Sequence, residues 1–259
     1  NRNVTTEPPT PCPSQHGERK EGLDFGGKDG RILTQDQLTK ARDLIRLAVD
    51  RREITAGSLV IWQHGRPVLE EGFGFRHPTD HSHPVDADSI FLLASITKPV
   101  TVTALMLLVE RGMISLGDPV VSHLPEFVGE DRARMQVRHL LSHTSGMPNM
   151  LPNNHALRQS HAPVDAFVEE ALKAELSFQP GTDFRYQSKG TLLAAEIVER
   201  LSGQRIRDFL KTNVFVPFGM KHTALGLGDW SIEDPVYCGT GPDEESFTSD
   251  WGHNSEYWR

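Results

Sequence analysis

The spacing of hydrophobic residues changes along the chain, and its first part predicts a helix followed by a β-hairpin. Apolar residues from Leu38 to Ala48 recur every three or four positions, as in an amphipathic helix, and Thr34 is suited to cap its start. Two strand-like runs follow, at Ser58 to Gln63 and at Pro67 to Phe75. The dipeptide His64-Gly65 between them is typical of a tight turn.

After residue 90 the pattern becomes helical. The segment from Ser95 to Arg111 is apolar on nearly every side, which predicts a buried helix, and Gly112 is suited to end it. Further helices are expected at residues 137–142, 164–176, 188–202 and 205–213. Strands before residue 76 and helices after residue 90 predict an α+β fold with a sheet lobe and a helical lobe.

Composition limits the partners that the protein can have. The chain of 259 residues carries a formal net charge of -8, which argues against a nucleic-acid partner or a basic membrane surface. We find no apolar run long enough to span a membrane. Cys12 and Cys238 are too few for a disulfide framework. The oligomeric state stays open.

The first 30 residues differ in composition from the rest of the chain. They are rich in Pro, Thr, Gly and charge, and we expect a disordered leader or linker there. The globular domain is therefore assigned to residues 31–259.

A polar segment from Arg76 to Asp88 contains three histidines, His77, His81 and His83. Histidines can bind a metal ion, but neither a cysteine nor a set of carboxylates completes a ligand shell in this segment. A solvated loop is the preferred interpretation, and we expect neither a metal nor another cofactor.

The candidate chemistry lies at Ser95 and Lys98. Serine is a weak nucleophile at neutral pH and needs a base within hydrogen-bond reach. Residues three apart on a helix share a face, so Lys98 can approach Ser95. Apolar neighbours are expected to bury Lys98, which would lower its pKa and favour the neutral amine. The pattern alone is weak, because a capping serine followed by a surface lysine gives the same letters.

Pro99 adds a geometric argument. Its nitrogen has no hydrogen to donate to the Ser95 carbonyl, so the regular helix is expected to begin near Ile96. Ser95 would then lie at the mouth of the helix, beside the positive end of its dipole. A developing oxyanion would be favoured there, with the backbone N–H of Ser95 as a donor.

The segment around Ser95 is FLLASITKP, residues 91–99, and three further segments follow it. They are GMISLGDPV (residues 112–120), HLLSHTSGM (139–147) and PGTDFRYQS (180–188). In this order the four segments resemble the serine β-lactamases and penicillin-binding proteins, above all the class C β-lactamases and related esterases, over about residues 35–225. The resemblance implies a β-lactamase/transpeptidase-like fold and a covalent acyl-enzyme.

The resemblance also implies roles for Tyr186 and Ser188. The tyrosine of the family's Tyr-x-Asn motif shares proton transfer with the lysine, and a neighbouring Lys98 cation would favour an ionised Tyr186. The asparagine of that motif helps to hold the substrate's amide side chain, and here Ser188 takes its place. A hydroxyl is shorter and lacks the amide, which weakens β-lactam recognition more than ester hydrolysis.

The family's third motif, Lys-Thr-Gly or His-x-Gly on a strand, is not found. His222-Thr223-Ala224 is a partial match that comes too early and precedes no predicted strand. We therefore expect this chain to be part of a longer protein, with the family's C-terminal strands beyond residue 259. Without them it would lack half of the oxyanion hole, leave a sheet edge unpaired and be inactive by itself.

Three functions follow, in order of preference. The first is a serine hydrolase that cleaves a small ester, amide or peptide through a Ser95 acyl-enzyme, with an esterase as first choice. The second is a β-lactamase or a D-amino-acid peptidase. The third is a non-catalytic member that binds peptidoglycan or assembles with itself. By analogy, the family's usual setting suggests the cell envelope or the outside of the cell.

Two other serine-hydrolase patterns receive less support. The sequence has no Gly-x-Ser-x-Gly, so an α/β-hydrolase architecture is not supported. Ser142 and Ser145 lie near His143 and could suggest a serine–histidine pair, but we interpret this segment as a structural loop.

Overall fold

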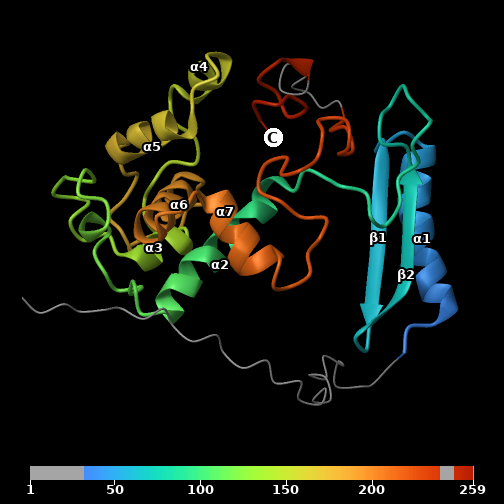
Figure 1. The fold of residues 1–259 in the computed structure, drawn as a ribbon, viewed down its shortest axis with the longest axis horizontal. Coiled ribbons are helices and arrows are strands. Elements are labelled where there is room, and N and C mark those ends of the chain that lie inside the picture. The colour runs from blue at the N-terminus through green and yellow to red at the C-terminus, as the bar shows by residue number, and fades with distance from the viewer. Residues whose placement is uncertain (1–31, 240–247, 259) are drawn as a thin grey trace, which may run out of the picture.

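A computed structural model describes residues 32–239 and 248–258, and their elements form two groups (Figure 1). On one side α1 (Gln35–Asp50) lies along a hairpin of β1 (Ala56–Gln63) and β2 (Arg66–Gly74). On the other side lies a cluster of helices. The predicted α+β fold with a sheet lobe and a helical lobe is confirmed. The leader or linker expected at residues 1–30, including Cys12, lies outside the described residues.

The start of α1 follows from a reciprocal cap between Gln37 and Thr34, and the sequence predicted the capping role of Thr34 alone. The Gln37 N–H donates to Thr34 Oγ1 over 3.3 Å, and the Thr34 N–H donates to Gln37 Oε1 over 2.9 Å. Two N–H groups at the helix start are thereby satisfied. The helix packs so closely on β1 that a β-carbon on Gly57 would lie 2.9 Å from Ile45 Cγ2. Part of the predicted apolar stripe is left uncovered, since Leu44 is 70% exposed.

The hairpin is antiparallel and pairs Ala56 with Gly74 at its open end, with one irregularity between Ile61 and Trp62. Its turn lies where it was predicted. His64 and Gly65 both have positive φ angles, of 50° and 73°, which suits the twist of a two-residue hairpin turn.

The helical lobe contains six α-helices within the described residues. They are α2 (Thr97–Glu110), α3 (Val137–Leu141), α4 (Asn154–Gln159), α5 (Val164–Lys173), α6 (Lys189–Ser202) and α7 (Ile206–Leu210). Helix α6 packs against α2, α3, α5 and α7, so it is the centre of the lobe. Its Leu193 and Ile197 are fully buried, as are Leu105 and Leu108 of α2. This core fixes the two helix ends that carry the candidate site.

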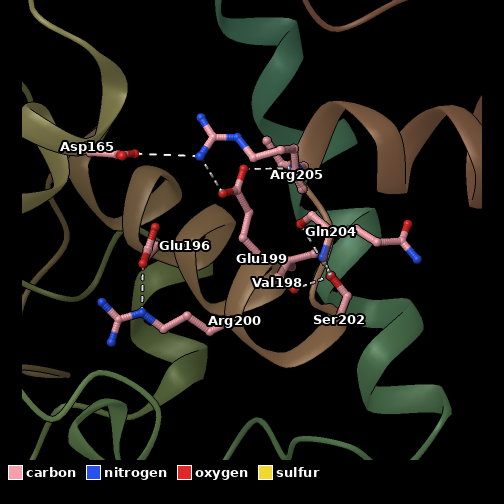
Figure 2. Close-up of polar contacts among 9 residues, drawn as sticks. Asp165, Glu196, Val198, Glu199, Arg200, Ser202, Gln204 and Arg205 are labelled. Carbon is pink, nitrogen blue, oxygen red and sulfur yellow. Dashed lines mark hydrogen bonds and ion pairs between the residues drawn. The ribbon is translucent and has the colours of Figure 1, made fainter.

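The turn from α6 to α7 is fixed by polar contacts, which Figure 2 shows. Gly203 follows α6 with a φ of 68°, the left-handed conformation that the sequence predicts for a helix stop. The Glu199 carboxylate accepts from the Ile206 N–H over 2.8 Å and so caps α7. Arg205 reaches the same carboxylate at 3.4 Å and Asp165 of α5 at 3.7 Å. The ion pairs thus join three helices.

Helix α5 ends three residues earlier than predicted, at Lys173, and Arg132 accounts for the end. Its guanidinium donates to the carbonyls of Leu172, Lys173 and Ala174 over 2.7, 3.0 and 2.8 Å. These carbonyls have no partner within the helix, so the arginine replaces the missing turn. The guanidinium also lies 5.1 Å from the ring centre of the buried Phe127.

Other predicted boundaries differ by a few residues. The helix expected at 205–213 ends at Leu210 and continues as a π-turn, Lys211–Phe215. The short α4 and a 3-10 turn at Val120–Ser122 were not predicted. Both are too short for hydrophobic periodicity to reveal them. Within the described residues, we find no helix whose length and hydropathy would let it cross a membrane.

Candidate active site

Ser95 lies in a 3-10 turn, Ala94–Ile96, directly before α2 begins at Thr97. The helix thus begins one residue after Ile96, near the predicted start, and Ser95 lies at the helix mouth as expected. Ala94 has a φ of 46°, in the left-handed region that a residue with a β-carbon rarely adopts. The peptide before Ser95 is thus held in a strained conformation by the structure around it.

Three side chains meet at Ser95 Oγ. Lys98 Nζ donates to it over 2.9 Å, and the Tyr186 hydroxyl donates to it over 2.7 Å. Lys98 Nζ also lies 4.8 Å from the centre of the Tyr186 ring. The structure thus brings together the three residues named from the sequence, one from the 3-10 turn, one from α2 and one from the segment before α6. The arrangement gives Ser95 two groups that can exchange its proton.

We call Ser95, Lys98 and Tyr186 the triad. Its electrostatics favour ionisation of the tyrosine. Hydrogen bonding to Lys98, then to Ser95, lowers the pKa of Tyr186 below its usual value of 10.0. Both groups stabilise a negative phenolate oxygen, which is the form that can accept a proton.

The site is more open than the sequence suggested. Ser95 is exposed, Lys98 is half-buried, and Ile96 beside them is 60% exposed. The apolar neighbours therefore do not enclose the amine within the described residues. The hydrophobic residues around Lys98 were interpreted as a buried environment. A sequence pattern cannot distinguish residues that bury a side chain from exposed apolar residues at the edge of a site.

His143 holds the backbone on both sides of Tyr186. Its carbonyl accepts from the Arg185 N–H over 2.9 Å, and its Nδ1 accepts from the Gln187 N–H over 3.4 Å. The ring centres of His143 and Tyr186 lie 4.8 Å apart. Burial, and then the charge of Lys98, lower the pKa of His143, so the ring is neutral at pH 7 and Nδ1 can accept.

No pattern in the sequence indicated this role of His143. The nearby serines make other bonds: Ser142 Oγ donates to the Arg138 carbonyl and Ser145 Oγ accepts from the Met147 N–H. No hydrogen bond between His143 and either serine is present in the described part of the chain.

Comparison with known proteins now decides the family. A model of the β-lactamase family matches residues 41–252, more than half of the chain. The chain belongs to the β-lactamase family. Penicillin-binding protein 4* of Bacillus subtilis is 32% identical over 175 residues, which are 65% of this chain and 38% of that protein.

Two solved structures are also similar. The octameric penicillin-binding protein homologue from Pyrococcus abyssi aligns with a TM-score of 0.62 and 29% identity, over 71% of this chain and 43% of that one. The D-amino acid amidase from Ochrobactrum anthropi SV3 aligns with a TM-score of 0.66 and 26% identity, over 76% of this chain and 55% of that one. The chain therefore spans 38% to 55% of the length of these three family members.

Position 188 departs from the Tyr-x-Asn motif with which the segment was compared. Ser188 is the residue before α6, but its hydroxyl makes no capping bond, contrary to the role that its place before a helix suggests. Ser188 Oγ instead donates to Asn149 Oδ1 over 2.7 Å. Asn149 lies in the loop after the segment HLLSHTSGM, and no sequence motif pointed to it.

Gln187 anchors the segment between Tyr186 and Ser188 in the helical lobe. It is fully buried, donates to the Leu140 carbonyl over 3.0 Å and accepts from the Gly190 N–H. Gln187 therefore lies inside the lobe between α3 and α6, whereas Tyr186 is 44% exposed and Ser188 is half-buried.

Lys189 is a buried cation next to the site. Its Nζ donates to Asn154 Oδ1 over 3.3 Å and lies 5.5 Å from the centre of the Phe167 ring. Burial, then the charges of Arg158 and Lys98, lower its pKa from 10.5 to about 8. The bond to Asn154 ties α4 to the start of α6.

The histidine loop and His222 take no part in the triad. His77 contacts Thr79, His83 contacts Ser82, and His81 stacks on Phe75. No group of three potential metal ligands occurs among the residues that the structure describes. His222 lies in a turn, 3.7 Å from Asp88, so it does not take the place of the strand-borne third motif.

A cavity of about 830 Å³ lies elsewhere, between α5 and α6. Its lining includes Glu126, Glu199, Arg200 and Arg205, whose charges are paired with one another. None of the triad residues lines this cavity. The chemistry therefore places the candidate site at Ser95 rather than in this cavity.

Proposed function

We propose that this chain carries the acylating centre of a serine hydrolase, with Ser95 as nucleophile and with Lys98 and Tyr186 as the groups that exchange its proton. The meeting of both groups at Ser95 Oγ, at 2.9 and 2.7 Å, is the observation that carries the proposal. Because the chain spans less than half of Penicillin-binding protein 4*, the activity of the whole protein is part of the proposal.

The proposed reaction has two halves. Ser95 Oγ bonds to the carbonyl carbon while its proton passes to the Tyr186 oxygen or the Lys98 nitrogen. The electron pair of the carbonyl moves to its oxygen, where the Ser95 N–H is one stabilising donor. The bond to the leaving group then breaks, and the leaving group takes up the proton. Water next attacks the acyl-enzyme in the same manner and releases the acid.

An ester is the first choice of substrate. The position at which the resemblance places an amide is occupied by Ser188, whose hydroxyl is engaged by Asn149. An alkoxide is also a better leaving group than an amine, so an ester makes the smaller demand on the proton-transfer groups. Amides of D-amino acids are the second choice, supported by the similarity to the D-amino acid amidase at 26% identity.

Labelling with a fluorophosphonate, which reacts with activated serines, tests this proposal on the complete protein. We expect a single label on Ser95, which Ser95→Ala abolishes. Ser142→Ala is the matched control and should keep the label, because Ser142 bonds to the Arg138 carbonyl and not to a base. Unchanged labelling in Ser95→Ala would reject the assignment, because another serine would then be the activated one. No labelling of the wild type would favour a non-catalytic peptidoglycan-binding or self-assembling protein.

Turnover measurements then separate the substrate classes. p-Nitrophenyl acetate reports ester hydrolysis, D-phenylalanine amide reports amide hydrolysis and nitrocefin reports β-lactam hydrolysis. The proposal expects the first to be the best of the three substrates.

A further inference from the structure

Arg76 is a half-buried arginine that follows β2 and lines a cavity of about 520 Å³. Its Nε is buried, and within residues 32–239 and 248–258 this atom has no hydrogen-bond partner. The guanidinium makes no ion pair in that part of the chain either. Asp86 lies near it, since the hydrogen bond from Ser89 and then the charge of Arg76 lower the pKa of the Asp86 carboxyl. A buried donor without an acceptor costs free energy, so an acceptor on a ligand would stabilise this side chain.

The backbone of Arg76 is fixed on both sides. Its N–H donates to the His83 carbonyl over 2.9 Å, which closes the polar segment of residues 76–83. Its carbonyl accepts from the Tyr237 N–H over 2.7 Å, so the segment of residues 232–237 lies against the same residue. Both segments line the cavity, and Arg76 joins them. Walls that are held by backbone hydrogen bonds lose little freedom when a ligand binds.

His77 provides a second donor in the same cavity. Its Nδ1 accepts from the Thr79 N–H over 3.3 Å, so the neutral ring carries its hydrogen on Nε2. The ring also lies edge-on to Tyr237, with their centres 4.9 Å apart, which orients it. These three residues line the cavity together with Arg76. An N–H donor near a guanidinium is a combination that suits a carboxylate.

Carboxylates line the cavity as well. Asp80 accepts from the Ser82 N–H over 2.9 Å, and Asp234 accepts from the Ser231 N–H over 2.7 Å, so both are held in place. Glu233 is exposed, and in the described part of the chain its side chain makes no hydrogen bond or ion pair. A simple anion would be repelled by these three carboxylates, whereas a positive group on the same ligand would be attracted to them.

We propose that this cavity is a binding site for a small zwitterion, with its carboxylate on Arg76 and its ammonium group facing the three carboxylates. A guanidinium binds a carboxylate through two parallel hydrogen bonds, which would give the buried Nε an acceptor. Ile232 and Pro235 also line the cavity, so methylene groups between the two charges of the ligand would cover apolar surface. None of the triad residues lines this cavity, and the site is independent of the proposed hydrolase function.

Three ligands with the same carbon chain test this on the complete protein by isothermal titration calorimetry. 6-Aminohexanoate carries both charges, hexanoate lacks the ammonium group and hexylamine lacks the carboxylate. We expect 6-aminohexanoate to bind, and each of the other two to bind at least about tenfold more weakly, the effect of one lost charged contact. Equal affinities for hexanoate and 6-aminohexanoate would overturn the zwitterion as ligand, and no binding of 6-aminohexanoate would overturn the site.

Variants then locate the bound ligand. Arg76→Met should weaken the binding of 6-aminohexanoate at least about tenfold. Arg76→Lys should retain part of the affinity, because it keeps the charge but loses the paired hydrogen bonds. Glu233→Gln should weaken binding by a smaller factor than Arg76→Met, because two carboxylates remain.

Arg66→Met is the matched control, since Arg66 is exposed at the other end of β2 (Arg66–Gly74), and it should bind like the wild type. An unchanged affinity in Arg76→Met would place the ligand elsewhere and overturn the proposal. Urea unfolding of each variant is measured in parallel. The midpoint of Arg76→Met should match that of the wild type, so that weaker binding reports the lost guanidinium and not a lost fold.

Discussion

The Tyr186 hydroxyl lies 2.7 Å from Ser95 Oγ, although the two residues are 91 positions apart. Lys98 approaches the same oxygen from one helical turn away. The serine thus has one proton partner fixed by local helix geometry and one fixed by the packing of α6 on α2.

The lowered pKa of Tyr186 predicts how the reaction depends on pH. Because its hydrogen bonds with Lys98 and Ser95 favour the phenolate, the proton-accepting form becomes populated below pH 10. We expect the rate of fluorophosphonate labelling of Ser95 to rise with pH through this ionisation. Tyr186→Phe should lose this rise and react about 10²- to 10³-fold more slowly. A Tyr186→Phe variant with the wild-type rate and pH profile would contradict the proposed role of Tyr186. Phe184→Leu is the aromatic control and should keep the wild-type pH profile.

His143 offers a test of positioning. We expect His143→Ala to slow labelling about tenfold or more, because the backbone on one side of Tyr186 loses its side-chain acceptor. His143→Asn should recover much of the rate, since an asparagine oxygen can accept from the Gln187 N–H and asparagine tolerates the φ of 60°. Equal rates in the two variants would mean that the accepting atom is unimportant.

Lys189 predicts a dependence of stability on alkaline pH. Its pKa of about 8 in the fold lies below 10.5, so the unfolded chain binds more protons between these values and stability rises with pH there. Relative to Lys189→Met, the wild type should gain up to roughly 3 kcal/mol between pH 8 and pH 10.5. Urea unfolding at several pH values measures this difference. Lys173→Met, at an exposed lysine, is the control and should show no such trend. If the difference in unfolding free energy between the wild type and Lys189→Met does not change with pH, Lys189 keeps its proton in both the folded and the unfolded state.

Arg132 predicts a large loss of stability from one surface-adjacent side chain. Arg132→Ala leaves the carbonyls of Leu172, Lys173 and Ala174 without their donor, which should cost about 2–4 kcal/mol in the free energy of unfolding. Arg134→Ala, an exposed arginine two positions away, is the control and should change stability by less than about 0.5 kcal/mol. Similar losses of stability in both variants would indicate a general effect of removing a positive charge rather than the loss of the hydrogen bonds from Arg132 to the end of α5.

Local features of the fold were predictable because their causes are local. The Thr34 cap, the His64-Gly65 turn and the Gly203 stop each depend on a few neighbouring residues. The approach of Lys98 to Ser95 follows from helix geometry for the same reason. The six-residue α4 was missed because it has too few turns to show a period.

The other parts of the site depend on contacts between distant segments. Nothing in the spacing of residues places Tyr186 at Ser95, and only the resemblance suggested it. The bonds of His143 to the backbone around Tyr186, and of Ser188 to Asn149, appear only when the loop before α4 is packed against the start of α6. A sequence pattern also cannot tell an apolar rim from an apolar interior, which is why the openness at Ile96 was not foreseen.

The positive φ of Ala94 has an evolutionary consequence. Glycine adopts this conformation without the cost of about 1 kcal/mol that a β-carbon brings, so a selection for heat resistance would favour Ala94→Gly. The same change would loosen the peptide that presents Ser95, the proposed nucleophile. If Ser95 is the nucleophile that we propose, thermostable descendants that carry this glycine are expected to react more slowly at Ser95.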